Sequence, residues 1–348
     1  MPELDPPGPP EHASLDRAEA RRPALLVIPT FNDWESLAGL LPMLDEALAA
    51  GGYAADVLIV DDGSTEPLRP DFARGPYRAL KRVDALPLRR NLGHQRAIAI
   101  GFAYAEDRLD HEAIVVMDAD GEDAPADVPR LLDCLRAKGG REIVFAERTR
   151  RSEDIVFRTF YGVYRFVHRY LTGYAVRVGN FSAVPRSRLE SLVVVDEMWN
   201  HYAAAVFRSR QPYCSIPTHR AHRLRGRSKM NFIGLVVHGL SAISVYGEIV
   251  GVRLLMLVIA MGGLAAAGLV ATVAIRLTTS LAIPGWATTA AGLSLMLLMQ
   301  AMMLAFVLCA VILGARRGTS FVPRKDYAIY IREPVRLDRP AASEESQA

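Results

Sequence analysis

Residues 114–123, IVVMDADGED, place four apolar residues directly before a segment with four acids in six positions. A short continuous apolar run is typical of a β-strand that is buried on both faces, as in a parallel sheet. The carboxylates at its exit repel one another unless a cation or basic side chains neutralise them. The stretch therefore predicts a buried strand that ends in a charged site.

The first half of the chain repeats this order of apolar run and polar exit. Strands are predicted at residues 24–29, 56–60, 113–117 and 142–146, and helices at residues 34–50, 94–106 and 126–137. Strands that alternate with helices indicate right-handed βαβ units, and hence an α/β, Rossmann-like and mostly parallel sheet flanked by helices. Ligands bind such sheets beyond the carboxyl ends of the strands. We therefore expect the acids at residues 61–62 and 118–123 to converge on one crevice.

Asp118 and Asp120 are two residues apart on an extended strand exit, so their carboxylates can share one ligand. Hard divalent cations such as Mg2+ or Mn2+ bind one or two carboxylates together with phosphate oxygens. The pair thus suits a nucleotide diphosphate. An EF-hand calcium loop is excluded, because the glycine comes too early and Pro129 occupies the position of the required glutamate. An acidic turn that caps the next helix through Asp123 and Asp127 remains the alternative.

The C-terminal third differs in composition. Residues 254–275 carry no charge between Arg253 and Arg276, and a second uncharged run covers residues 283–315. A helix needs about 20 apolar residues to cross a bilayer, so the runs predict a transmembrane hairpin with spans at 254–275 and about 287–313. The connecting loop carries one arginine, whereas the outer flanks are rich in arginine and lysine. The positive-inside rule therefore places the N-terminal domain and both termini in the cytoplasm.

The remaining composition narrows the class of protein. A net charge of +3 gives no reason to expect a nucleic-acid partner. Three scattered cysteines allow no disulfide framework or zinc site, which fits a reducing compartment. Residues 1–22 have no apolar core, so we expect a disordered tail there and no signal peptide.

Five motifs occur in an order that resembles the family 2 glycosyltransferases of the GT-A fold. They are IPTFND (28–33), VDDGST (60–65), RNLGHQ (90–95), MDADGED (117–123) and RLRGRSKMNF (223–232). Within that family, the chain is most similar to polyprenyl-phosphate and dolichol-phosphate sugar synthases, over residues 23–320 or so.

The resemblance implies roles for particular residues. The nucleotide sugar would be bound by Pro29, Thr30, Asp33, Asp61, Asp62, Asn91, Gln95, Asp118, Arg223, Ser228 and Lys229. The metal ligands would be Asp118, Asp120 and Glu122, and the catalytic residues Asp120, Asn180 and Arg148. Residues 219–229 hold five Arg or Lys and two His, which suits a diphosphate. The same basic residues could also bind anionic lipid at the membrane surface, and this interpretation is compatible with the first.

Two positions depart from the family pattern. Glu122 stands where glutamine is common, and Asn180 stands where a GDFR-like motif supplies an aspartate. Asparagine cannot accept a proton at neutral pH, but a phosphate acceptor is already anionic and needs little help from a base. Asn180 would then orient the acceptor. A hydroxyl acceptor would need a base, for which Glu197 and His201 are the candidates.

The sequence thus predicts an integral membrane enzyme, of the bacterial inner or plasma membrane, that moves a hexose from a UDP- or GDP-sugar to a polyisoprenyl phosphate with inversion. A hydroxyl acceptor and an inactive membrane adaptor are the alternatives. The expected parts are a tail (1–22), a glycosyltransferase domain (23–230), a juxtamembrane helix (231–252), the hairpin (253–315) and a cytoplasmic tail (316–348). Aromatic and arginine residues within 155–171 suit a helix at the lipid headgroups, although a core-packing helix fits too. Homo-oligomer formation is left open.

Overall fold

The computed structural model describes residues 23–67, 72–73, 75–148, 169–173, 178–225, 232–279, 285–315 and 321–338. Several predicted features lie outside this part of the chain: the tail at 1–22, the interfacial helix up to residue 168, and Ser228 and Lys229. The side chain of Arg148 is likewise not described, although its backbone ends a strand.

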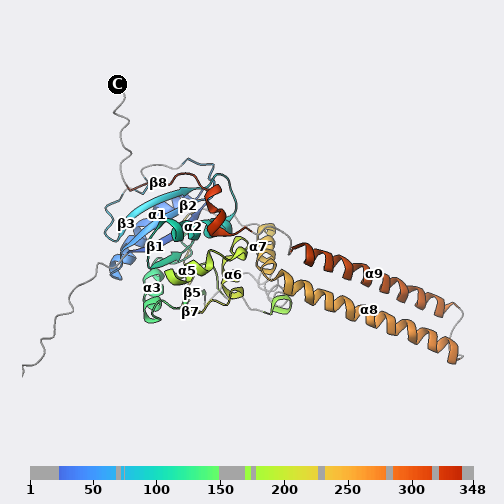
Figure 1. The fold of residues 1–348 in the computed structure, drawn as a ribbon. Helices are drawn as coiled ribbons and strands as arrows, with labels where there is room; N and C mark the ends of the chain where they lie inside the picture. The colour runs from blue at the N-terminus through green and yellow to red at the C-terminus, as the bar shows by residue number, and fades with distance from the viewer. Residues whose placement is uncertain are drawn as a thin grey trace, which may run out of the picture.

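The described residues form one eight-stranded mixed sheet in the order β7-β5-β6-β4-β1-β2-β3-β8 (Figure 1). The strands are β1 (Ala24–Thr30), β2 (Ala55–Asp61), β3 (Leu80–Pro87), β4 (Ala113–Val116), β5 (Ile143–Arg148), β6 (Ser182–Pro185), β7 (Tyr213–Thr218) and β8 (Val335–Arg336). The strands β4, β1, β2 and β3 run parallel, and β6 and β8 pair antiparallel to their neighbours. The predicted α/β class with a mostly parallel sheet is confirmed.

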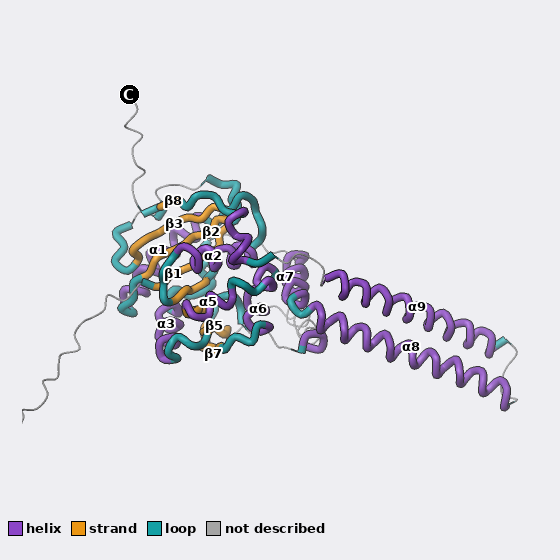
Figure 2. The backbone as a smooth tube through the Cα atoms, in the orientation of Figure 1, coloured by secondary structure: helices purple, strands orange, loops and turns teal. Residues whose placement is uncertain are grey.

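Helices cover both faces of the sheet (Figure 2). One face packs on α1 (Trp34–Ala50) and α3 (Asp127–Ala137), and the other on α2 (His94–Arg108), α5 (Arg186–Leu192) and α6 (Tyr202–Arg208). Side chains alternate across a strand, so Leu26 of β1 joins the first core and Leu25 the second. This double burial explains why the central strands are apolar at every position.

Beyond the sheet, α7 (Phe232–Ser244) leads into the long apolar helices α8 (Gly247–Thr278) and α9 (Trp286–Ala315), which extend side by side away from the domain (Figures 1 and 2). Gly251 of α8 lies against Ile312, and Gly262 lies against Ala301, so the two helices are antiparallel. Both are long and apolar enough to cross a bilayer, and little of either is buried within the protein. The expected single helix at 231–252 is instead divided, because α7 ends at Ser244 and α8 begins at Gly247.

The break between α7 and α8 joins the hairpin to the domain. Val245 and Tyr246 are 2% and 1% exposed and pack on Ala204 of α6. The Tyr246 hydroxyl donates to the Ala204 carbonyl at 3.4 Å, and Arg208 of α6 lies 3.8 Å from Glu248 of α8. The start of α8 is therefore held by both apolar and charged contacts.

The segment after the hairpin returns to the domain and is part of its fold. It forms α10 (Pro323–Asp326), a 3-10 turn (Tyr327–Ile329) and strand β8, which pairs with β3. Tyr327 and Leu337 are each 3% exposed, and the Tyr327 hydroxyl bonds Asp107 of α2. Within the predicted tail, residues 321–338 therefore pack as a strap on the domain, and both ends of the hairpin lie on the domain's side.

We expect the strap to contribute to stability. Replacing the buried ring in Tyr327→Ala should lower the free energy of unfolding by about 3 kcal/mol, because it opens a cavity between the strap and α2. Ile329 is 66% exposed, so Ile329→Ala should change it by less than about 0.5 kcal/mol. Thermal unfolding of detergent-purified variants measures the difference. Equal transition temperatures would show that the strap does not stabilise the domain.

Candidate functional site at the carboxyl edge of the sheet

Strands β4, β1 and β2 are neighbours and parallel, so their carboxyl ends meet at one edge, as expected. Asn32, in the left-handed region with φ 49°, ties the loop after β1 to the loop after β2. Its backbone N–H donates to Ser64 Oγ at 2.9 Å, and its side-chain oxygen accepts the Thr65 N–H at 2.8 Å. Asp61 Oδ1 accepts the Ser64 N–H at 2.9 Å. These bonds hold the loops after β1 and β2 against each other.

Asp62 shapes the next loop and is 3% exposed. Its two carboxylate oxygens accept the Leu92 and Gly93 N–H groups at 2.7 and 2.8 Å. Burial raises the pKa of Asp62, and these two bonds partly offset the effect. Gly63 must be glycine, because its φ is +69° and a Cβ there would lie 2.6 Å from the Asn91 nitrogen. Asp62 therefore positions the loop that opens α2.

That loop presents His94, which we did not select from the sequence although it lies within the RNLGHQ motif. His94 Nε2 lies 3.2 Å from Asp118 Oδ1 and 3.0 Å from Asn180 Nδ2. Desolvation alone would lower the pKa of His94, but the carboxylates of Asp118, Asp123 and Asp62 outweigh it and raise that pKa. His94 therefore joins the acid pair to the predicted catalytic asparagine.

Asn180 is held from the opposite side by Gln95. Gln95 Nε2 donates to Asn180 Oδ1 at 3.2 Å, and Gln95 Oε1 accepts the Tyr202 N–H at 2.8 Å. Gln95 is 9% exposed, so it acts as a bridge between Asn180 and α6. The fold thus brings Asn180, distant in sequence, beside Asp118.

The DADGED loop is folded by its own carboxylates. Asp123 Oδ2 accepts the Asp118 N–H at 3.0 Å, and Asp120 Oδ1 accepts the Glu122 N–H at 2.9 Å. Neither Asp123 nor Asp127, the two acids of the alternative capping interpretation, makes a capping bond, although Asp127 lies in the first turn of α3. The cap position of α3 is Ala126 and no side chain makes a capping bond there, because Asp123 is already used to fold the loop.

The basic segment at residues 219–225 lies directly on this loop. The Leu224 N–H donates to the Asp120 carbonyl at 2.9 Å, and the Ala221 N–H donates to the Glu122 carbonyl at 3.0 Å. Gly121 has φ +80°, and a Cβ there would lie 2.5 Å from Leu224 Cγ. A glycine is thus needed for both the backbone angle and the close approach.

Two arginines of this segment neutralise the acids. Arg223 Nη2 donates to Asp120 Oδ2 at 2.5 Å and its Nε lies 3.7 Å from Glu122 Oε1. Arg220 Nε donates to Glu122 Oε2 at 2.9 Å. Burial raises the pKa of Asp120, as do the neighbouring charges of Asp118 and Glu122. A cation beside Asp120 is therefore favourable.

The other predicted nucleotide-binding residues differ in their exposure to solvent. Pro29 and Thr30 are buried in β1. Asn91 is exposed, and the Asp33 carboxylate accepts from the Ser36 hydroxyl at 2.8 Å. Asp33 precedes α1 as expected but makes no capping bond.

The residues suit a divalent cation only in part. Asp118 and Asp120 supply hard oxygen donors, and the Arg223 guanidinium already stands in for a cation at Asp120. The described residues contain no preformed group of three or more acids, histidines or cysteines that could hold a metal ion. In particular, Glu122 pairs with arginine and does not converge with the two aspartates into the three-ligand set expected from the sequence.

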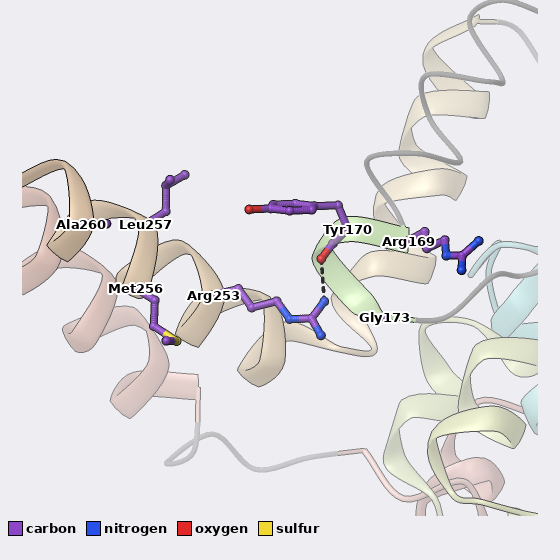
Figure 3. A pocket seen from close by; sticks show the side chains of 7 residues that line it. All are labelled: Arg169, Tyr170, Gly173, Arg253, Met256, Leu257 and Ala260. Carbon is purple, nitrogen blue, oxygen red and sulfur yellow. Dashed lines mark hydrogen bonds between the residues drawn. The ribbon is translucent and has the colours of Figure 1, made fainter.

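A separate pocket of about 760 Å³ lies at the base of the hairpin (Figure 3). It is lined by Arg169, Tyr170, Gly173, Arg253, Met256, Leu257 and Ala260. Arg253 Nη1 donates to the Tyr170 carbonyl at 2.5 Å, so this guanidinium ties residues 169–173 to α8.

The mostly parallel sheet with helices on both faces, and its acidic edge covered by an arginine segment, define a GT-A-like domain. Residues 25–189 of the chain match the model of glycosyl transferase family 2.

Among curated proteins, the chain is similar to the undecaprenyl-phosphate 4-deoxy-4-formamido-L-arabinose transferases of Salmonella paratyphi B and Salmonella newport. The identity is 27% over 219 residues in each case, and the match spans 61% of this chain and 63% of each relative. The chain thus spans less than two thirds of the length of these relatives.

Two solved structures are also similar. Glucosyl-3-phosphoglycerate synthase from Mycobacterium tuberculosis, in complex with Mn2+, UDP-glucose and phosphoglyceric acid, is 18% identical with a TM-score of 0.45 and covers 66% of this chain and 80% of its own. Mannosyl-3-phosphoglycerate synthase from Rubrobacter xylanophilus is 13% identical with a TM-score of 0.43 and covers 64% and 72%.

The role of Asp62 can be tested by amide hydrogen exchange. Asp62→Ala removes the acceptor of two N–H groups, so exchange at Leu92 and Gly93 should become at least about tenfold faster, which corresponds to about 1.4 kcal/mol of lost protection. Asp110→Ala, an exposed aspartate before β4, is the control and should leave both amides protected. Unchanged exchange in Asp62→Ala would contradict the positioning role.

Proposed function

We propose that the protein is a membrane-bound glycosyltransferase that moves a sugar from a nucleotide sugar to a polyisoprenyl phosphate. The observation that carries this proposal is the pairing of Asp120 with Arg223 at the carboxyl edge of a family 2 domain. In such a pair, the carboxylate can bind a divalent cation and the guanidinium can bind a diphosphate. The names of the Salmonella relatives support undecaprenyl phosphate as the type of acceptor.

Catalysis would depend on stabilising the charge of the leaving diphosphate. Asp118 and Asp120 would hold Mg2+ or Mn2+, which supplies positive charge to that diphosphate. Arg223 donates N–H bonds to phosphate from the opposite side of the crevice. Asp61 and Asp33, at the ends of β2 and β1, are placed to accept from the nucleoside. A single displacement by the acceptor oxygen inverts the anomeric centre.

The acceptor is attributed to the Asn180 side of the crevice. Asn180 can orient a phosphate through its amide N–H groups but cannot accept a proton, which suits an acceptor that is already anionic. The candidate bases for a hydroxyl acceptor are engaged elsewhere. His201 is 5% exposed and its Nδ1 accepts the Ala204 N–H at the start of α6, while Glu197 Oε1 accepts from Arg208 at 2.5 Å. These contacts favour the phosphate acceptor.

We further propose that α8 and α9 span the plasma membrane with the domain in the cytoplasm. Because the strap packs on the domain, the hairpin has its ends on one side and its loop on the other. The residues that flank the hairpin are basic and its connecting loop carries few charges, which favours a cytoplasmic location for the domain.

Cysteine labelling tests this topology. In a cysteine-free background, Thr279→Cys at the hairpin loop should react with an impermeant maleimide added to intact cells, and Glu190→Cys on α5 should react only after lysis. Labelling of Glu190→Cys in intact cells would place the domain outside and overturn the assignment.

Enzyme activity is tested with membranes, a polyisoprenyl phosphate, Mn2+ or Mg2+, and radiolabelled UDP- and GDP-sugars. Wild type should form a chloroform-extractable product, and Asp120→Asn should lower its rate at least about 100-fold, since a charge-stabilising group is worth several kcal/mol. Asp110→Asn is the matched control and should retain full activity. If no sugar gives a lipid product, or if Asp120→Asn and Asp110→Asn have equal rates, the inactive membrane adaptor is favoured. If product forms only on a lipid with a hydroxyl acceptor, transfer to a hydroxyl group is favoured.

A further inference from the structure

The acids of the DADGED loop are not left to repel one another, because arginines of the facing segment bind them. Arg223 lies between two carboxylates, bonded to Asp120 at 2.5 Å and 3.7 Å from Glu122. Arg220 bonds the other oxygen of Glu122 through Nε at 2.9 Å. Glu122 thus has two guanidinium neighbours. They balance its negative charge, so no metal ion is needed to explain an acid at this position.

We propose that Arg223 and Arg220 bind two anions in turn: the Asp120 and Glu122 carboxylates before substrate arrives, and the diphosphate of the nucleotide sugar once a divalent cation occupies Asp118 and Asp120. This assigns a specific substrate-binding role to Arg220, which belongs to the basic segment 219–229 but precedes the RLRGRSKMNF motif, and it rests on the proposed function.

The geometry favours an exchange of side chains over a movement of the whole segment. Backbone bonds hold the segment at both arginines, from the Ala221 N–H to the Glu122 carbonyl and from the Leu224 N–H to the Asp120 carbonyl. Leu224 also packs on Gly121. The guanidiniums can therefore leave the carboxylates by rotation of their own side chains while the backbone stays docked.

Burial makes the competition between cations effective. The side chains of Arg223 and Asp120 are only 20% and 11% exposed, so their attraction is weakly screened by water. A cation that binds Asp120 must displace Arg223 from it. Once displaced, the buried guanidinium needs a new anion, and the diphosphate that accompanies the cation supplies one. Cation and nucleotide should then favour each other's binding, and this coupling is reciprocal.

If this exchange occurs, one substitution, Arg223→Gln, should raise the affinity for Mn2+ and lower the affinity for UDP or GDP. Without nucleotide, Arg223→Gln removes a competitor, so its affinity for Mn2+ should rise about tenfold, as expected for the loss of about 1.4 kcal/mol of competing interaction. With Mn2+ present, the same variant lacks a diphosphate donor, so its affinity for UDP or GDP should fall about tenfold. Arg220→Gln should show both changes to a smaller degree, because Arg220 is 43% exposed.

The experiment uses the full-length protein in detergent. Mn2+ binding is measured from the free-ion electron paramagnetic resonance signal, and UDP and GDP binding by calorimetry. Arg225→Gln is the matched control: it removes the same charge from an exposed arginine of the same segment, outside the described contacts to the acid loop, and should change either affinity less than about twofold. Thermal unfolding verifies that each variant is folded.

A second variant tests the carboxylate partner. Glu122→Gln releases Arg220, so UDP or GDP binding without Mn2+ should tighten several-fold, whereas Asp110→Asn should leave it unchanged. The exchange is overturned if Arg223→Gln behaves as Arg225→Gln does, or if its Mn2+ and nucleotide affinities change in the same direction. Wild type that binds both ligands but forms no lipid product contradicts the proposed function alone. Wild type that binds neither contradicts both.

Discussion

Mutual repulsion of carboxylates at the carboxyl edge of the sheet is the constraint on which the site depends. Parallel strands bring the acids after β2 and β4 to the same edge, and a folded chain must then neutralise them. The protein does so with Arg223 and Arg220 on one side and His94 on the other. The two arginines belong to the segment 219–225 and His94 begins α2, so balancing the charges also brings these separate parts of the chain together.

The loops around this edge are ordered mainly by side-chain to backbone bonds. Asn32, Asp62 and Asp123 each accept backbone N–H groups of a loop, and each is an Asx residue placed just beyond a strand. Asp62, predicted to bind the nucleotide, and Asp123, offered as a helix cap, therefore both support loops through backbone bonds.

The hairpin and the domain are connected at two points. Tyr246 and Val245 join the start of α8 to α6, and the strap after α9 packs on α2 and on β3. The elements contacted in this way also carry the site, since α2 begins with His94 and the N–H of Tyr202 at the start of α6 bonds Gln95. The position of the acidic edge relative to the apolar helices α8 and α9 is thus fixed by packing on both sides.

The sequence by itself determined the parallel centre of the sheet, its acidic edge and the apolar hairpin. These features follow from continuous apolar runs and from residues adjacent in the chain. It did not determine β7, because Pro217 within this short run argues against a strand, or β8, because two residues are too few to show a periodicity. The partners of Glu122 and the contact of His94 with Asn180 were likewise decided only by the tertiary structure. The physical reason is that residues 86 to 98 positions apart meet only when separate segments dock on one edge.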